Sequence, residues 1–303
     1  MQANALSIVD QFEKSGAFFN IIQEPIKTAS GIAIPNKVAN IREDNGAILG
    51  VVGKGYKVAP YKESIVLPAV DALEKSGLDL TGAQASVRFA NSGGRMISVI
   101  TLPNEKMFVD TPNGRDEHSL QVLLRSGHDA DFFVDFRPGA VRMACFNGNY
   151  AVDAIGALKM KHTSKFNPNL LHEQAKILLA SFKTAGEKWG AWSRRPLEDD
   201  QAARVIGIYC REDKEVLNRG MKGVAEQKEK RETKFTRLVD RYVDHEKREI
   251  GATAWGVYNT LTWDATHAPL AEGKEATSAV LRHANVARTI GDRYWTKQLQ
   301  LAA

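Results

Sequence analysis

The chain has 303 residues, of which 43% are hydrophobic and 25% are charged, and its formal net charge is +5. This composition is typical of a soluble globular protein. No apolar run reaches the roughly 18 residues of a membrane span, and the N-terminal segment has neither a basic leader nor a continuous apolar core. Because the two cysteines, Cys145 and Cys210, suit a reducing compartment, we expect a cytoplasmic protein.

The first 150 residues are dominated by strand and turn signals. Amphipathic helices are expected within residues 1–20 and at 62–75. Between them, the Asp-Asn-Gly sequence at 44–46 favours a hairpin, because Asn-Gly tolerates the positive φ angles of a tight turn. A second hairpin is expected over residues 83–103. Further strands are predicted at 119–126, 131–137 and 140–145.

From residue 150 onward the hydrophobic periodicity becomes helical. Helices are expected from Pro168 to about residue 192 and at 198–217, 222–249, 252–263 and 277–299. Residues 226–234 are almost entirely charged or polar, so this part of the helix should be exposed. We therefore predict an α+β fold, with a β-rich core and one inserted helix in residues 1–155 and a mainly helical region in 156–303. The sequence leaves open whether the two parts form one domain.

Residues 126–149 contain a notable cluster of acidic side chains. In an extended strand, Asp129, Asp131, Phe133 and Asp135 would share one face, and Ala130, Phe132, Val134 and Phe136 the other. This alternation predicts a half-buried strand with an acidic solvent face. Carboxylates about 7 Å apart along a strand suit a single metal ion poorly, so we predict no metal site. His128, Asp129 and Asp131 remain weak candidates for a metal-dependent nuclease or phosphoesterase.

Other motifs of catalysis are weak or missing in the sequence. Gly50, Gly53 and Gly55 lie within a predicted strand and match neither the Walker nor the dinucleotide pattern, so bulges or a bend explain them better. Cys145 is expected to be a buried structural cysteine. The chain has no Gly-x-Ser-x-Gly elbow, HExxH helix or paired CxxC. We assign no catalytic residue and no cofactor.

The positive charge of the chain is concentrated in residues 156–195, which contain eight lysines and arginines and two glutamates. Cations interleaved with aromatic rings are typical of surfaces that hold single strands, since lysines neutralise phosphates and rings stack on bases. Phosphate contacts are expected from Lys159, Lys161, Lys165, Lys188, Arg194 and Arg195, stacking from Phe166, Trp189 and Trp192, and secondary contacts from Arg142 and Tyr56. The alternative is that both tryptophans are core residues and the lysines form a solvated helix face.

Five motifs occur in the order "LGVVGKGYKV", "SGHDA", "RMACFNGN", "KHT" and "TAWGVYNTLTWDATH". This series resembles the phage/plasmid-like family called domain of unknown function 932, over about residues 35–295. The matching positions are Gly50, Val52, Gly53, Tyr56, His128, Asp129, Arg142, Cys145, Asn147, His162, Thr253, Trp255, Asn259 and His267. The chain departs from the family pattern at Ala130, where glycine is common, and in "NTLTWDATH", where the usual acidic residue is replaced.

The resemblance implies a phage, prophage or plasmid origin and no settled activity. The order of elements is also similar to the annealing core of Rad-fifty-two-type recombination proteins, which form rings on single-stranded DNA. We therefore expect a protein that binds single-stranded DNA as a homo-oligomer, in recombination or replication. Two alternatives are a phage protein that binds and inhibits a host protein, and the nuclease considered above.

Overall fold

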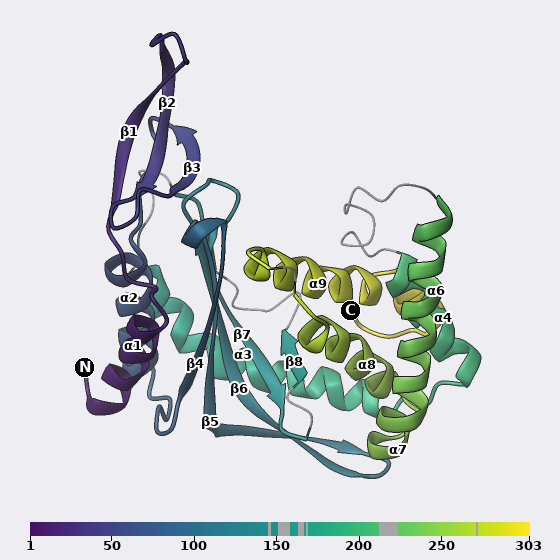
Figure 1. The fold of residues 1–303 in the computed structure, drawn as a ribbon. Coiled ribbons are helices and arrows are strands. Elements are labelled where there is room, and N and C mark those ends of the chain that lie inside the picture. The colour runs from purple at the N-terminus through teal and green to yellow at the C-terminus, as the bar shows by residue number, and fades with distance from the viewer. Residues whose placement is uncertain (145–146, 151–157, 163–166, 168, 212–223, 271) are drawn as a thin grey trace.

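The structure is a computed structural model, which describes the whole chain except residues 145–146, 151–157, 163–166, 168, 212–223 and 271. Antiparallel strands occupy most of the N-terminal half, and helices dominate from residue 170 to 298 (Figure 1). Within the described residues, the strands form one sheet of three strands and one of six. The predicted α+β fold is confirmed.

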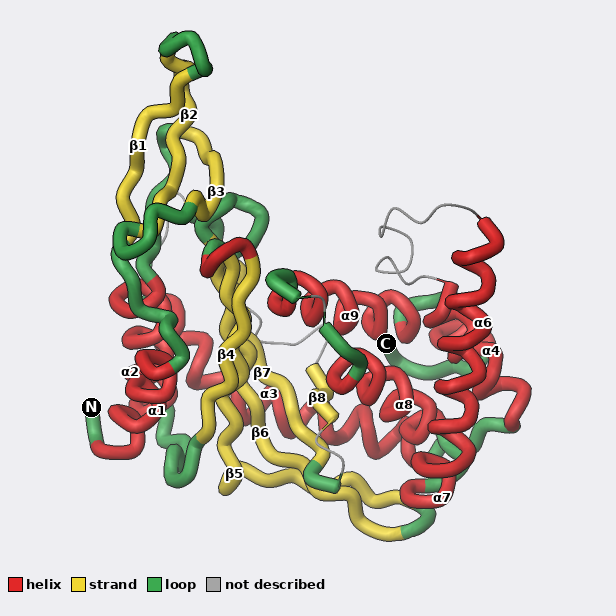
Figure 2. Tube along the Cα trace, in the orientation of Figure 1, coloured by secondary structure: helices red, strands yellow, loops and turns green. Residues whose placement is uncertain are grey.

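The three-stranded sheet projects from the rest of the molecule as a ribbon (Figures 1 and 2). It consists of β1 (Ile21–Lys27), β2 (Ala33–Arg42) and β3 (Ile48–Gly53), in the order β1-β2-β3. The hairpin predicted around residues 44–46 joins β2 to β3, and Gly46 there has a φ angle of +71°. Strand β1 was not predicted, because its side chains are mostly exposed and lack an alternating hydrophobic pattern.

The six-stranded sheet forms the centre of the fold. It contains β4 (Gln84–Ala90), β5 (Arg95–Thr111), β6 (Gly114–Gly127), β7 (Val134–Arg142), β8 (Asn147–Tyr150) and β9 (Leu158–Met160). The order is β4-β5-β6-β7-β8, and β9 also pairs with β7. The strands predicted at 131–137 and 140–145 are in fact one strand, because Pro138 and Gly139 continue β7 with regular pairing to β6.

Helices cover both faces of this sheet (Figure 1). The helices are α1 (Ala3–Lys14), α2 (Leu67–Lys75), α3 (Leu170–Ser193), α4 (Asp199–Arg211), α6 (Val224–Arg241), α7 (Lys247–Ile250), α8 (Ala254–His267) and α9 (Glu275–Ile290). Short π-helical segments at Tyr61–Val66, Tyr242–Glu246 and Tyr294–Gln298 extend α2, link α6 to α7 and follow α9. None of the helices described is long and apolar enough to cross a membrane.

The main hydrophobic core draws on both halves of the chain. It lies between one face of the six-stranded sheet and helices α1, α2 and α3, and it continues between α3 and α8. A smaller apolar cluster joins the opposite face of the sheet to α9 through Ile97, Leu123 and Ala279. In the charged segment of α6, Glu229, Lys230 and Glu232 are exposed, as predicted.

Candidate nucleic-acid interface

A loop at the base of the ribbon brings together several residues of the family motifs. Residues 53–57 connect β3 to the segment that precedes α2, and Tyr56 is half-buried within this loop. Its ring stacks on the imidazole of His162, with centroids 5.1 Å apart and an interplanar angle of 22°. Its hydroxyl donates a hydrogen bond to the Gly127 carbonyl oxygen at 2.7 Å. Burial raises the pKa of Tyr56, so the hydroxyl remains a donor.

His128 lies beneath this loop and is fully buried. Its ring packs on Tyr61 at a centroid distance of 4.3 Å, and its carbonyl oxygen accepts a hydrogen bond from Asn40 Nδ2 at 2.6 Å. Within the described residues, neither ring nitrogen of His128 has a hydrogen-bond partner. Burial, with a smaller contribution from His162, lowers the pKa of His128 to about 3, and burial lowers that of His162 to about 4. Both imidazoles are therefore neutral at physiological pH.

A close backbone contact explains why a glycine occupies position 50. A Cβ atom at Gly50 would lie 2.5 Å from Asp129 Cα and 3.0 Å from the His128 carbonyl oxygen, which is nearer than non-bonded atoms approach. Strand β3 is thus pressed directly against the turn that follows β6. Because of this contact, the motif residues Gly50, Tyr56, His128, Asp129 and His162 meet at one place, although they span more than 110 positions of the sequence.

The acidic stretch is a turn rather than a strand over its first half. Residues 128–133 connect β6 to β7, and Ala130 has a φ angle of +67°. Asp129 Oδ1 accepts a hydrogen bond from the backbone N–H of Asp131 at 3.0 Å, which closes the turn. Arg95 forms ion pairs with both Asp129 and Asp131. In the part of the chain that the structure describes, no three His, Cys, Asp or Glu side chains are grouped to hold a metal ion.

The prediction that the acidic residues of this stretch face the solvent is wrong for Asp135. This carboxylate is 0% exposed and is ion-paired with Arg125 at 2.8 Å and with Arg137. Both partners are on the same sheet, since Arg125 lies opposite Asp135 in the β6–β7 register. The apolar series is buried as expected at Phe132 and Val134.

Exposed cations surround the Tyr56 loop. Lys54 and Lys57 flank Tyr56, and Lys161 precedes His162; all three side chains are exposed. The backbone N–H of Lys57 donates to the His162 carbonyl oxygen at 3.2 Å, which places Lys161 beside the loop. Lys161 was expected from the sequence to bind phosphate, but Lys54 and Lys57 were missed. Their spacing around an aromatic residue in "GKGYK" was the available signal.

The basic segment 156–195 is not one surface. Its C-terminal cations Arg194 and Arg195 are exposed just after α3, whereas Lys161 lies before this helix. A helix of 24 residues is about 36 Å long, so the two groups are far apart. Only the backbone of Lys159 is described, as part of β9, and Lys165 and Phe166 lie outside the described residues.

The two tryptophans expected to stack on bases are in the core. Trp189 is 3% exposed and packs parallel to Trp255, with centroids 5.3 Å apart. Trp192 is 2% exposed, and its indole N–H donates to the Ala302 carbonyl oxygen at 3.0 Å. The expectation that these rings are exposed is wrong, because their spacing of three places both on the face of α3 that packs inward. Lys188 lies near this core, its Nζ being 5.6 Å from the centre of the Trp192 ring.

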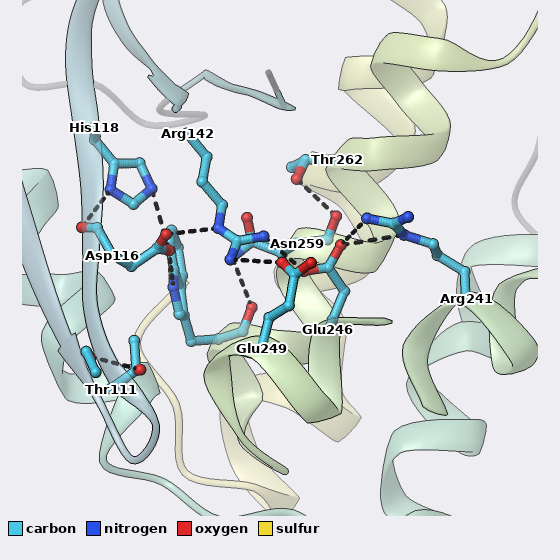
Figure 3. A network of polar contacts seen from close by, with 11 residues as sticks. Thr111, Asp116, His118, Arg142, Arg241, Glu246, Glu249, Asn259 and Thr262 are labelled. Carbon is cyan, nitrogen blue, oxygen red and sulfur yellow. Dashed lines mark hydrogen bonds and ion pairs between the residues drawn. The ribbon is translucent and has the colours of Figure 1, made fainter. Parts of the chain in front are cut away.

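Arg142 is also buried, so the expected contact with DNA is wrong. It is 2% exposed and lies at the centre of the polar network in Figure 3. Its Nε pairs with Asp116 at 2.6 Å, its Nη1 with Glu246 at 2.9 Å and its Nη2 with Glu249 at 3.1 Å. These carboxylates come from β6 and from the segments after α6. Arg142 therefore joins the sheet to the C-terminal helices.

Neighbouring residues complete this network. The other oxygen of Asp116 accepts a hydrogen bond from Trp255 Nε1 at 3.1 Å, and Glu246 also pairs with Arg241 at 2.8 Å. Burial lowers the pKa of His118, which packs between Trp189 and Trp255. Burial raises the pKa of Glu246, and the charges of Arg142 and Arg241 oppose that rise. The network thus has a structural role in positioning α8 on the sheet.

Comparisons with known proteins give one result. Residues 48–294 match the model of the family described as "Domain of unknown function (DUF932)". No curated protein and no solved structure matches the chain. The match covers most of the sequence, including the ribbon strand β3, the central sheet and helices α3 to α9. The chain therefore belongs to the DUF932 family.

Proposed function

We propose that this protein binds single-stranded DNA at the surface formed by residues 53–57 and Lys161. The observation that carries the proposal is the half-exposed Tyr56 ring, held in place by His162 and surrounded by three exposed lysines. Lysines bind phosphates without reading sequence, and an aromatic ring offers a stacking surface to any base. Stacking on His162 and the hydroxyl bond to Gly127 fix the ring before a strand arrives, which lowers the entropic cost of binding.

The wider role that we propose is recombination, strand annealing or replication in a phage or other mobile element. The protein would act as a homo-oligomer in the cytoplasm of the host cell. Two lysines on the projecting ribbon, Lys27 and Lys37, are exposed and would add to the cationic surface, and Glu24 is exposed on the same ribbon.

Fluorescence anisotropy with labelled oligo-dT over a series of salt concentrations tests the proposal. Three phosphate contacts give a slope of log affinity against log salt of roughly −2, at about 0.7 per contact for single strands. Replacing Lys54, Lys57 and Lys161 together by alanine should remove this part of the slope. The matched control replaces Lys14, Lys228 and Lys297, which are exposed elsewhere, and should leave the slope unchanged.

Variants of Tyr56 separate stacking from charge. Tyr56→Ala should weaken binding by about 1–3 kcal/mol with little change in the salt slope. Tyr56→Phe retains the ring and loses only the bond to Gly127, so it should bind nearly as well as the wild type. No binding of the wild type at low salt would refute the proposal. A flattened slope after replacement of Lys188, Arg194 and Arg195 instead would move the interface to the far end of α3.

A further inference from the structure

A groove of about 450 Å³ lies between the six-stranded sheet and helix α9, on the face opposite α1 and α2. Side chains from β4, β5 and β6 form its floor, and Ala279 and His283 of α9 form one wall. The sheet register places these floor residues in rows across the strands, in which Arg88 lies opposite Ile97, and Thr101 opposite Gln121. The groove is separate from the Tyr56 loop.

At one end of the groove, the side chain of Gln121 carries a hydrogen-bond acceptor that has no partner among the described residues. Gln121 is 7% exposed, and its Nε2 donates to Thr101 Oγ1 at 2.9 Å. Its Oε1 is buried and has no hydrogen-bond partner within the described residues. A buried carbonyl oxygen without a donor costs free energy, so an occupant that supplies an N–H group would be favoured. The adjoining walls are apolar, with Val99, Val141 and Met143.

The other end presents a cation. Arg88 is half-buried, and across the described parts of the chain no carboxylate pairs with it. Among the described residues that line the groove there is no Asp or Glu. The nearby His283 is neutral, because burial, the charge of Arg88 and that of Arg282 lower its pKa to about 3. This end therefore favours an anionic group, and a guanidinium is well shaped to bind a phosphate through two hydrogen bonds.

The distance between the two ends limits the size of the ligand. Arg88 and Gln121 are two strands apart and four residues apart in register along β5, which gives a Cα separation of about 16 Å at ~3.3 Å per residue and ~4.8 Å per strand. Both side chains line the groove, so a ligand that contacts both must span a distance of this order, less the lengths of the two side chains.

We propose that this groove binds a nucleotide, with the phosphate on Arg88, the base between Val99, Val141 and Met143, and a base N–H donated to Gln121 Oε1. Every natural base carries such an N–H on its Watson–Crick edge. Amino acids and peptides with a free ammonium fit poorly, because the described part of the lining provides no carboxylate. A fatty acid would leave the buried acceptor of Gln121 unpaired. The nucleotide is either free or part of a bound strand.

Isothermal titration of the full-length protein with dAMP and with deoxyadenosine tests this assignment. The wild type should bind dAMP more tightly than deoxyadenosine, because only dAMP reaches Arg88. Arg88→Ala should abolish that difference, and Gln121→Met should weaken binding of both ligands about tenfold, the usual effect of a lost buried hydrogen bond. Arg115→Ala, at the exposed β5–β6 turn, and Gln298→Met are the matched controls and should bind like the wild type.

Thermal unfolding of each variant shows whether the fold is intact. The proposal is overturned if folded wild type does not bind dAMP at millimolar concentration, if dAMP and deoxyadenosine bind equally, or if Arg88→Ala retains the phosphate preference. Competition by oligo-dT identifies the source: displacement of dAMP means that a nucleotide of a strand occupies the groove, and no displacement means that a free nucleotide does. Binding of oligo-dT through Lys54, Lys57 and Lys161 is measured separately, so either proposal can fail alone.

Discussion

Replacement of Arg142 by methionine should destabilise the protein strongly. Methionine fills a similar volume, but it leaves the carboxylates of Asp116 and Glu246, at 4% and 0% exposure, buried without the guanidinium that pairs with both. Loss of one partner of a buried ion pair costs roughly 3–5 kcal/mol of unfolding free energy. The third partner, Glu249, adds little, because its side chain is 47% exposed and hydrated.

The loss should depend on pH in a defined direction. Burial already raises the pKa of Glu246, and removal of the opposing Arg142 charge raises it further. A carboxyl whose folded-state pKa is above its unfolded value stabilises the fold below that unfolded value, and this contribution is lost as the pH rises through the folded pKa. The difference in stability between Arg142→Met and the wild type should therefore be smaller at pH 5 than at pH 8.

Urea unfolding followed by tryptophan fluorescence measures this difference. The double variant Arg142→Met with Glu246→Gln should recover part of the loss at pH 8, because the amide carries no charge. Arg115→Met on the surface is the control and should change the stability by no more than about 0.5 kcal/mol. A cost of Arg142→Met below about 1 kcal/mol, or an equal cost at pH 5 and pH 8, would refute the buried network as the cause.

Three further outcomes follow from the structure. Gly50→Ala should lower the stability by about 1–3 kcal/mol, since its Cβ would meet the backbone at 2.5 Å; an unchanged melting temperature would contradict the close contact. Phe132→Ala should cost about 3–5 kcal/mol, whereas Asp131→Asn, at an exposed side chain, should cost under ~1 kcal/mol and leave the proposed DNA binding unchanged. Because burial lowers the pKa of His128 from 6.5 to about 3, the unfolded state binds more protons between these values, and the stability falls with acidification below pH 6.5. His128→Phe should reduce this acid dependence in unfolding titrations, and an identical pH profile would contradict a buried neutral imidazole.

Local patterns in the sequence were sufficient to predict most helices and both hairpins. They failed in the acidic stretch, where the alternation of residues 129–136 implied one continuous strand. The turn there depends on the Asp129 side chain and on Arg95, which is more than 30 positions away. Likewise, Asp135 is buried because Arg125 faces it across the sheet. An alternating pattern does not show which carboxylates will receive a cationic partner from another strand.

The candidate site was predicted only in part. Tyr56 and Lys161 were identified, and the structure places both at one surface. The prediction of one basic surface in residues 156–195 treated cations as neighbours although a helix about 36 Å long separates them. The groove beneath α9 could not be predicted from the sequence, because only the register of strands β4, β5 and β6 brings Arg88 and Gln121 into the same groove. A cluster of charged residues in the sequence therefore predicts a charged surface only where those residues also lie close together in the fold.

The buried network around Arg142 has a consequence for how the chain folds during its synthesis. Glu246 is made 104 positions after Arg142, and Trp255 is made 139 positions after its partner Asp116. At about 5–20 residues per second, a ribosome needs roughly 5–20 s to supply Glu246 once Arg142 has been added. During this interval, Asp116 is the one of the three carboxylates described as partners of Arg142 that has already been made. The ion pairs of Arg142 that join the central sheet to the C-terminal helices thus form only after residue 246 has been translated.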